Sequence, residues 1–118
     1  MRVPSINGQR FFGASALLTA AVLACASHGT NALAAPGTHQ VVIEGMQFSP
    51  QSLVVKAGDM VVWVNKDAFV HDATAIDGSF KAKPIAPNGS WKFKANKKGT
   101  FAYICTIHPT MKGSLTVE

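Results

Sequence analysis

Cysteine is scarce in this chain of 118 residues, which contains only Cys25 and Cys105. Two cysteines form one disulfide at most, so a fold held together by several bridges is excluded. Cys25 lies in the apolar N-terminal region, and its removal during export would leave Cys105 as the single thiol. An unpaired cysteine in an exported protein is either an inert buried side chain or a functional thiol, for example a metal ligand.

Long apolar runs are also lacking, apart from the one between Phe11 and Ala26. This run is shorter than the roughly 20 residues that a membrane-spanning helix needs. Arg2 and Arg10 precede it and the small residues Ala32-Leu33-Ala34 follow it, which is the order of a secretory signal peptide. We predict a signal peptide over residues 1–34 and a periplasmic domain over residues 35–118 with no membrane span.

A lipid tether is the alternative interpretation of this region. The sequence Val22-Leu23-Ala24-Cys25 loosely resembles a lipobox, in which Cys25 would be lipidated and retained. Leu23 fits that pattern imperfectly and the site after Ala34 fits signal peptidase well. Removal of Cys25 with the signal peptide is therefore preferred.

Acidic residues are few, with six Asp and Glu against 11 Lys and Arg. Both arginines lie in the predicted signal peptide, so residues 35–118 have nine basic side chains and a net charge of +3. Lys92 and Lys94 alternate with apolar residues within Trp91–Ala95, which is typical of the solvated face of a half-buried strand. A surface formed with Lys97 and Lys98 that steers an acidic protein partner is the alternative. A nucleic-acid partner is not expected.

Helical periodicity is absent after residue 38, where apolar and polar residues alternate instead. This alternation predicts half-buried strands at residues 40–44, 52–56, 60–65, 72–75, 91–95, 100–105 and 114–117. Turn sequences such as Asp77-Gly78 separate them. Many short strands without crossover helices predict one all-β domain, an antiparallel β-sandwich or small barrel. The predicted core residues are Trp63, Phe93, Phe101, Tyr103, Leu115 and Val117.

Cys105, His108 and Met111 follow one another with the spacing C-x-x-H-x-x-M between two predicted strands. A thiolate, an imidazole and a thioether on one short loop suit copper better than magnesium, calcium or manganese. His71 follows the strand-like run at residues 60–65 and a few loop residues, where a strand end can present it as a fourth ligand. These residues predict one copper ion in a trigonal His₂Cys site with Met111 as a weak axial ligand.

Each of these residues has an ordinary alternative interpretation. A histidine such as His71, taken alone, is more often a surface residue, and a methionine such as Met111 is more often core filler. Their conjunction favours the metal site, whereas His28 and His39 have no comparable context. Zinc fits the same ligands tetrahedrally but has no redox function.

The sequence from Val41 to Glu118 resembles the small blue copper proteins, or cupredoxins, and most of all their amicyanin group. The similar stretches are residues 48–50 (FSP), 55–59 (VKAGD), 62–65 (VWVN), His71, 99–101 (GTF) and 103–113 (YICTIHPTMKG). Two residues between His108 and Met111 make the short ligand loop typical of that group. The resemblance implies a Greek-key sandwich of about eight short strands with copper near one end.

The resemblance also implies that electrons pass through the exposed edge of His108. An apolar collar of Ile107, Pro109, Phe69 and Pro84 would receive a redox protein donor or acceptor, with ordinary loop packing as the alternative. The family commonly has an amide or hydroxyl residue after the first histidine ligand, where this sequence has Asp72. An ionised carboxylate directed at copper would favour Cu(II) and lower the reduction potential.

We therefore expect a monomeric carrier of single electrons between redox proteins. A module for copper delivery or storage is the alternative, although a cage of one thiolate and two imidazoles disfavours easy release. A fragment of a multicopper oxidase or copper nitrite reductase is not expected. Residues 35–118 lack the further histidine pairs that additional copper centres need.

Overall fold

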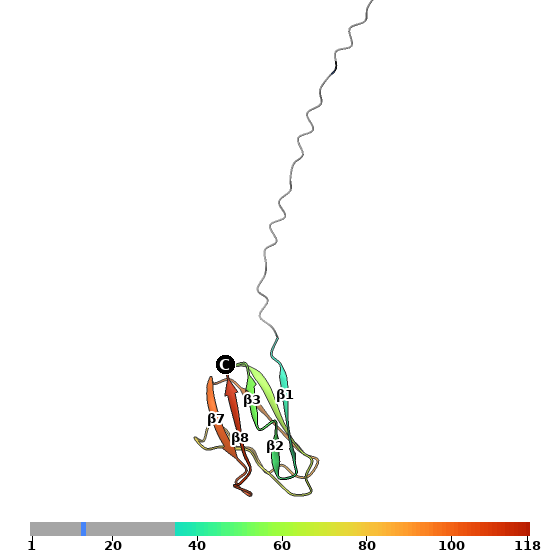
Figure 1. Ribbon diagram of the computed structural model, residues 1–118, viewed down its shortest axis with the longest axis vertical. Helices are drawn as coiled ribbons and strands as arrows, with labels where there is room; N and C mark the ends of the chain where they lie inside the picture. Colours follow the sequence, from blue (N-terminus) through green and yellow to red (C-terminus); the bar gives the residue numbers. More distant parts are fainter. Residues whose placement is uncertain (1–12, 14–34) are drawn as a thin grey trace, which may run out of the picture. The chain divides into compact units, whose positions relative to one another are not determined.

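The computed structural model describes Gly13 and residues 35–118. The predicted signal peptide and the alternative lipidation site at Cys25 lie outside the described residues, apart from Gly13. Residues 35–118 form two four-stranded sheets that pack face to face (Figure 1). The strands are β1 (Thr38–Glu44), β2 (Gln47–Ser49), β3 (Ser52–Val55), β4 (Asp59–Asn65), β5 (Thr74–Ala75), β6 (Ser90–Ala95), β7 (Gly99–Ile104) and β8 (Lys112–Val117).

The predicted all-β sandwich is confirmed, but its sheets are mixed rather than purely antiparallel. One sheet has the strand order β2-β1-β4-β6 and the other has the order β3-β8-β7-β5. The pairs β1–β4 and β3–β8 are parallel, and the remaining pairs are antiparallel. The reason is that the chain crosses between the sheets before it returns to a neighbour, so the two strands can run in the same direction.

Seven predicted strands are present, with ends that differ by one or two residues. The missed strand is β2, which contains a single buried residue, Phe48. Three residues are too few to show an alternating pattern, and the following Ser49-Pro50 looks like a turn. No helix among the described residues reaches the length and apolar character of a membrane span.

The core lies between the two sheets and is rich in aromatic rings. Trp63, Tyr103 and Leu115 are at most 1% exposed, and the rings of Trp63 and Tyr103 meet edge to face at 5.6 Å. Phe101 and Val117 are also buried, as predicted. Phe93 is only partly buried, since it lies on β6 at the edge of its sheet, where the gap between the sheets opens to solvent.

Gly113 in β8 allows the core to close around Tyr103. A methyl group at position 113 would overlap the phenol ring, whose Cε1 would lie only 2.8 Å away. Burial also raises the pKa of the Tyr103 hydroxyl to about 12, and this hydroxyl has no hydrogen-bond partner among the described residues. The absence of a side chain at position 113 therefore leaves room for the Tyr103 ring to lie across β8.

We expect Gly113→Ala to lower the free energy of unfolding by about 1–3 kcal/mol, because overpacking a filled core has that cost. Urea denaturation of the metal-free domain measures the change. Gly37→Ala is the matched control, because its added methyl would meet no atom of another residue closer than 3.6 Å. Equal losses in the two variants would contradict the steric explanation.

Asp59, the first residue of β4, links the segment before β1 to the turn before β4 through hydrogen bonds. Its carboxylate accepts hydrogen bonds from the backbone N–H groups of Gly37 at 2.8 Å and Lys56 at 3.0 Å, and it pairs with His39 Nε2 at 2.9 Å. The hydrogen bond with His39 and these backbone bonds lower the pKa of Asp59 from 3.8 to about 2. His39 is thus a structural partner of Asp59.

A lowered carboxyl pKa stabilises the folded state above the unfolded pKa, and this contribution disappears as the pH falls through the folded pKa. The stability advantage of the wild type over Asp59→Asn should therefore be full above about pH 4 and decline toward pH 2. Thermal unfolding of the metal-free proteins across this range tests the expectation. Glu44→Gln changes an exposed carboxylate and is the control, for which no such dependence is expected. A pH-independent difference for Asp59→Asn would contradict the stabilising role of the Asp59 carboxylate.

Candidate metal centre

His71 is fully buried in the loop that follows β4. Its backbone pairs with Ile85, with His71 N–H donating to Ile85 O at 3.2 Å and Ile85 N–H donating to His71 O at 2.7 Å. The buried Asn65 side chain donates to the carbonyls of Phe69 at 2.7 Å and Ile85 at 2.9 Å, and its Oδ1 accepts the N–H of Asp67 at 2.9 Å. These bonds fix the loop on both sides of His71.

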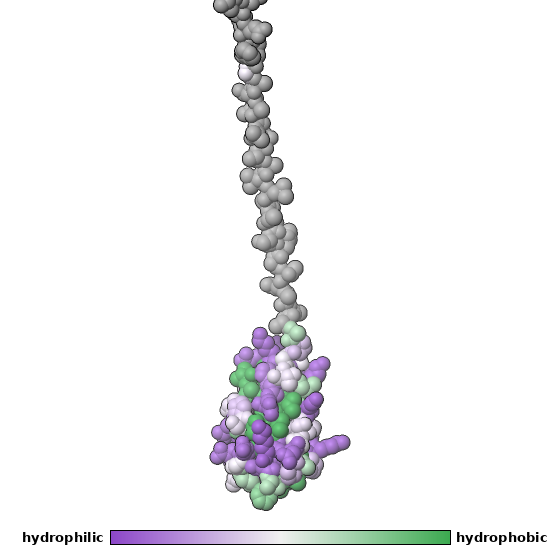
Figure 2. Space-filling model, turned by 90° about the vertical axis from the view of Figure 1, so that its right-hand side faces the viewer, coloured by the Kyte–Doolittle hydropathy of each residue, from purple (hydrophilic) through white to green (hydrophobic). Residues whose placement is uncertain are grey.

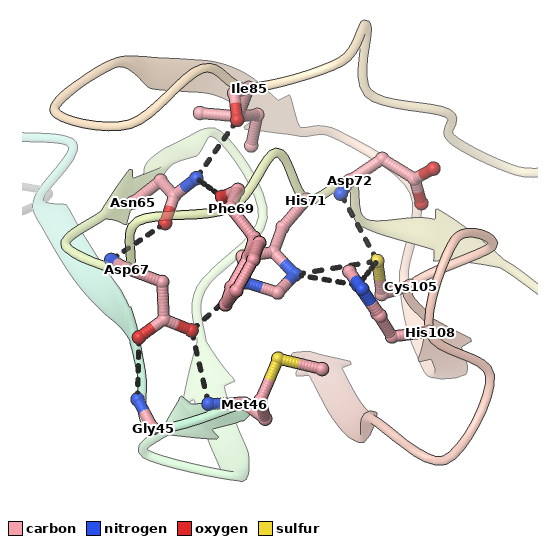
Figure 3. Close-up of polar contacts among 10 residues, drawn as sticks. All are labelled: Gly45, Met46, Asn65, Asp67, Phe69, His71, Asp72, Ile85, Cys105 and His108. Carbon is pink, nitrogen blue, oxygen red and sulfur yellow. Dashed lines mark hydrogen bonds and ion pairs between the residues drawn. The ribbon is translucent and has the colours of Figure 1, made fainter.

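Asp67 determines the orientation of the His71 ring (Figure 3). Its Oδ2 lies 2.9 Å from His71 Nε2, and its two oxygens accept the N–H groups of Gly45 at 2.7 Å and Met46 at 3.0 Å. Desolvation opposes the charge of Asp67, but the hydrogen bonds from Met46, Gly45 and His71 outweigh it, so the pKa is lowered. Because Nε2 is engaged, Nδ1 is the ring nitrogen that faces Cys105 and His108.

The prediction from the sequence missed Asp67 and Asn65. A usable clue is their spacing, because an Asn side chain that accepts the N–H two residues later forms an Asx turn. Asp67 also stands four residues before His71, within the same loop. Neither residue is a metal-ligand candidate itself, since both are committed to holding the loop.

The loop from Cys105 to Met111 is closed by its own backbone. Cys105 follows the last residue of β7 and its N–H donates to Met111 O at 3.2 Å, while Met111 N–H donates to His108 O at 2.9 Å. Cys105 is fully buried, Met111 is 2% exposed, and His108 is partly exposed. These two bonds hold the backbone of Met111 beside those of Cys105 and His108.

Three ligand atoms from the two loops form a compact triangle. Cys105 Sγ lies 3.8 Å from His71 Nδ1 and 3.8 Å from His108 Nδ1, and the two nitrogens are 3.2 Å apart. The point equidistant from these corners is about 2.1 Å from each, within the ~2.0–2.3 Å that imidazole nitrogen and thiolate sulfur keep from a transition metal. His71, Cys105 and His108 thus fit one metal ion, and Met111 is held next to them.

Asp72 joins the two loops rather than pointing at the metal position. Its backbone N–H donates to Cys105 Sγ at 3.4 Å, whereas its carboxylate accepts hydrogen bonds from the Thr106 N–H at 2.9 Å, from the Thr106 hydroxyl and from Thr74 Oγ1 at 3.2 Å. Figure 3 shows the carboxylate directed away from the sulfur. Asp72 therefore takes the loop-tying position that the resemblance assigns to an amide or hydroxyl residue.

Residues 15–117 match the family model of the cupredoxin-like domain. The chain belongs to the cupredoxin family. Amicyanin-alpha of Methylorubrum extorquens is 32% identical to this cupredoxin over 112 residues, which cover 91% of this chain and 90% of the relative. Two solved structures are also similar, a Cu(I) form of an amicyanin variant and a copper-containing nitrite reductase from Thermus scotoductus.

The amicyanin structure is 30% identical and superposes with a TM-score of 0.66, covering 72% of this chain and 86% of that chain. The nitrite reductase is 32% identical with a TM-score of 0.65, covering 76% of this chain but only 24% of the enzyme. The likeness to amicyanin therefore extends over most of both proteins, whereas the enzyme is similar in only about a quarter of its length.

Exposed apolar side chains surround the candidate metal centre of this cupredoxin. Phe69 is 64% exposed, Ile107 is 50% exposed, and Val70 and Met46 are 39% and 38% exposed. Apolar colour covers the end of the domain in Figure 2 where these loops lie. Two further members of the predicted collar are exposed prolines, Pro84 and Pro109. The partly exposed His108 thus reaches the surface within an apolar area.

Proposed function

We propose that this cupredoxin is a type 1 copper protein that transfers single electrons between redox proteins. His71, Cys105 and His108 would be the strong copper ligands, and Met111 the weak axial ligand. The observation that supports the proposal best is the triangle formed by the two histidine nitrogens and the cysteine sulfur, which we call the N₂S triangle. A thiolate with two imidazoles is the donor set of one-electron copper sites. Copper would supply the redox couple, and the chain would supply a fixed ligand geometry.

The residues around the triangle are arranged to hold the ligands still. His71 is restrained by Asp67 and by its pairing with Ile85, and Cys105 accepts the N–H of Asp72. Ligands that do not move when the charge changes keep the reorganisation small, which favours rapid electron exchange. The partly exposed imidazole of His108 is the shortest connection from the triangle to solvent among the three ligands, since the other two are fully buried.

The apolar collar around His108 suits brief docking of a donor or acceptor protein. Weak electron-transfer complexes bury little area, so a few exposed apolar side chains such as Phe69, Ile107 and their neighbours suit such an encounter. Docking there would place the partner's redox centre against the imidazole edge.

Copper delivery or storage is the competing function. Full burial of His71 and Cys105 disfavours it, because copper release would require the loops to separate. Transfer of copper to a metal-free acceptor can be compared with electron transfer from a reduced donor in the same preparation. Faster metal transfer than electron transfer would favour the competing function.

Enzymatic turnover is not part of the proposal. The likeness to amicyanin covers 86% of that protein's chain, whereas the similar nitrite reductase is matched over only 24% of its chain. Zinc fits the same triangle geometrically, but it offers no redox change.

Export to the periplasm is proposed from the sequence of residues 1–34. Mass spectrometry of the protein isolated from cells would give the mass of residues 35–118 if the signal peptide is cleaved after Ala34. A chain that begins at a lipid-modified Cys25 would support the tethered alternative instead.

Addition of Cu(II) to the metal-free domain should produce intense visible absorption from thiolate-to-copper charge transfer. Cys105→Ser should abolish this band, because the thiolate is its source. His39→Ala removes an imidazole outside the triangle and should leave the band unchanged. A colourless wild type, or a band that persists in Cys105→Ser, would disprove the proposed site.

The Asp72 carboxylate is directed at Thr106 and not at the metal position, so it would act on copper only through space. Asp72→Asn should therefore raise the reduction potential by no more than tens of millivolts, on the order expected for one nearby negative charge at an effective dielectric constant near 20. The amide can still accept the Thr106 N–H, so the loops stay joined. Voltammetry of the copper protein measures the shift. Asp77→Asn, at an exposed carboxylate outside the site, is the control, and an unchanged or lower potential in Asp72→Asn would refute the electrostatic effect.

A further inference from the structure

The acidic and basic side chains of residues 35–118 are distributed very differently between the interior and the surface. Three of the six carboxylates are buried or half-buried and hydrogen-bonded to other side chains or backbone groups: Asp59 to His39, Asp67 to His71 and Asp72 to Thr106. The exposed acids are Glu44, Asp77 and Glu118, whereas all nine lysines are exposed. The surface is therefore considerably more basic than the net charge of +3 suggests.

Six of these nine lysines lie along one edge of the sandwich, which we call the lysine edge. It consists of Lys81, Lys83, Lys92, Lys94, Lys97 and Lys98. Two segments form this edge. Strand β6 is the outermost strand of its sheet, and residues 80–85 run beside β5, with bridges from Lys81 to Thr74 and from Ile85 to His71.

The two segments of the lysine edge are joined by apolar packing. Phe80 and Phe93 meet with ring centroids 4.9 Å apart, and Phe80, Ala82 and Ile85 are buried. The alternate positions, Lys81 and Lys83, are exposed, as are Lys92 and Lys94 on β6. The segments therefore display their lysines from a single rigid border of the domain.

Protection of edge strands is the ordinary explanation for such lysines, because charges prevent edge-to-edge pairing. This explanation applies to Lys92 and Lys94, which lie on the edge strand β6. It does not apply to Lys81 and Lys83, which precede β6 outside the strands, or to Lys97 and Lys98, which lie in the turn between β6 and β7. Protection of an edge strand therefore accounts for only part of the lysine edge, and the remaining lysines are available to a partner.

The lysine edge continues to the metal end of the domain. Lys83 stands two residues before Ile85, whose backbone pairs with the ligand candidate His71. The one exposed acid near the edge is Asp77, whose carboxylate accepts the Ser79 N–H at 2.9 Å. Hydrogen bonds from Ser79 are the main cause of its lowered pKa, and the charge of Lys97 contributes less. A partner that contacts His108 can therefore also meet lysines on this side of the apolar collar.

We propose that the lysine edge receives the acidic surface of a redox protein and orients it so that electrons pass through His108. This inference rests on the proposed electron-carrier function and identifies the chemistry of the partner. Charge complementarity of this kind accelerates encounter more than it strengthens the final complex. The apolar collar would provide the close contact, and the lysine edge would provide the attraction and the orientation.

The test uses the copper-loaded Cu(I) domain and an acidic c-type cytochrome of higher potential as the probe, with stopped-flow measurement of the second-order rate constant. Lys92→Glu/Lys94→Glu should slow the reaction about tenfold or more at low ionic strength. The matched control is Lys56→Glu/Lys66→Glu, which changes the net charge equally at exposed lysines outside the edge and should slow it less than threefold. Lys81→Glu/Lys83→Glu should behave like the first variant.

High salt provides the second arm of the test. The difference between the variants should disappear at about 0.5 M salt, where charges more than a few ångströms apart are screened. A basic cytochrome should react more slowly with the wild type than the acidic one does at low salt. Equal slowing in the edge and control variants, or no dependence on salt, would overturn the proposal.

The visible spectrum and reduction potential of each variant are recorded beforehand. A variant that keeps the wild-type spectrum and potential has an intact copper site, so a slower reaction then reports a docking defect. We expect every variant to keep both, because none of the exchanged lysines contacts the ligand triangle. Failure of the wild type to bind copper would refute the proposed function itself. A normal spectrum with unaltered rates in the edge variants would refute only the lysine edge.

Discussion

The orientation of one buried imidazole depends on a carboxylate that the metal does not need to touch. Asp67 accepts two backbone N–H groups from the turn between β1 and β2 and pairs with His71 Nε2. It therefore connects the β1–β2 turn to the loop after β4, which contains the ligand candidate His71. If this contact were lost, His71 could rotate and the N₂S triangle would no longer have fixed sides.

The same use of carboxylates shapes the outer surface. Asp59, Asp67 and Asp72 satisfy backbone or side-chain donors inside the fold, so their charges are not displayed to solvent in the way that the lysines are. A buried or half-buried anion is tolerated only where donors surround it, which explains why each of these residues has several partners. The hydrogen bonds that hold these three carboxylates inside the fold thus also leave lysines in excess on the surface.

Much of the fold could be predicted from alternation alone. The strands around Val61–Trp63 and Phe101–Tyr103 were predicted because a half-buried strand must place every second side chain inward. Strand β2 was not predicted, because three residues are too few to show an alternation of apolar and polar side chains. The parallel pairs β1–β4 and β3–β8 could not be predicted, because direction depends on how the chain crosses between sheets and not on any local residue preference. Phe93 was placed in the core for its apolar character, and only its position on an edge strand exposes it.

The sequence by itself determined the kind of chemistry, since Cys105, His108 and Met111 on one short loop define a soft ligand set wherever the loop lies. It also indicated His71 as the missing partner. Tertiary structure alone decided that His71 Nδ1 stands 3.8 Å from the sulfur, that Asp72 joins the loops, and that residues 80–85 bring their lysines beside β6. The physical reason is that ligand type is a property of individual side chains. Distances between segments that are far apart in the chain depend on the packing of the two sheets.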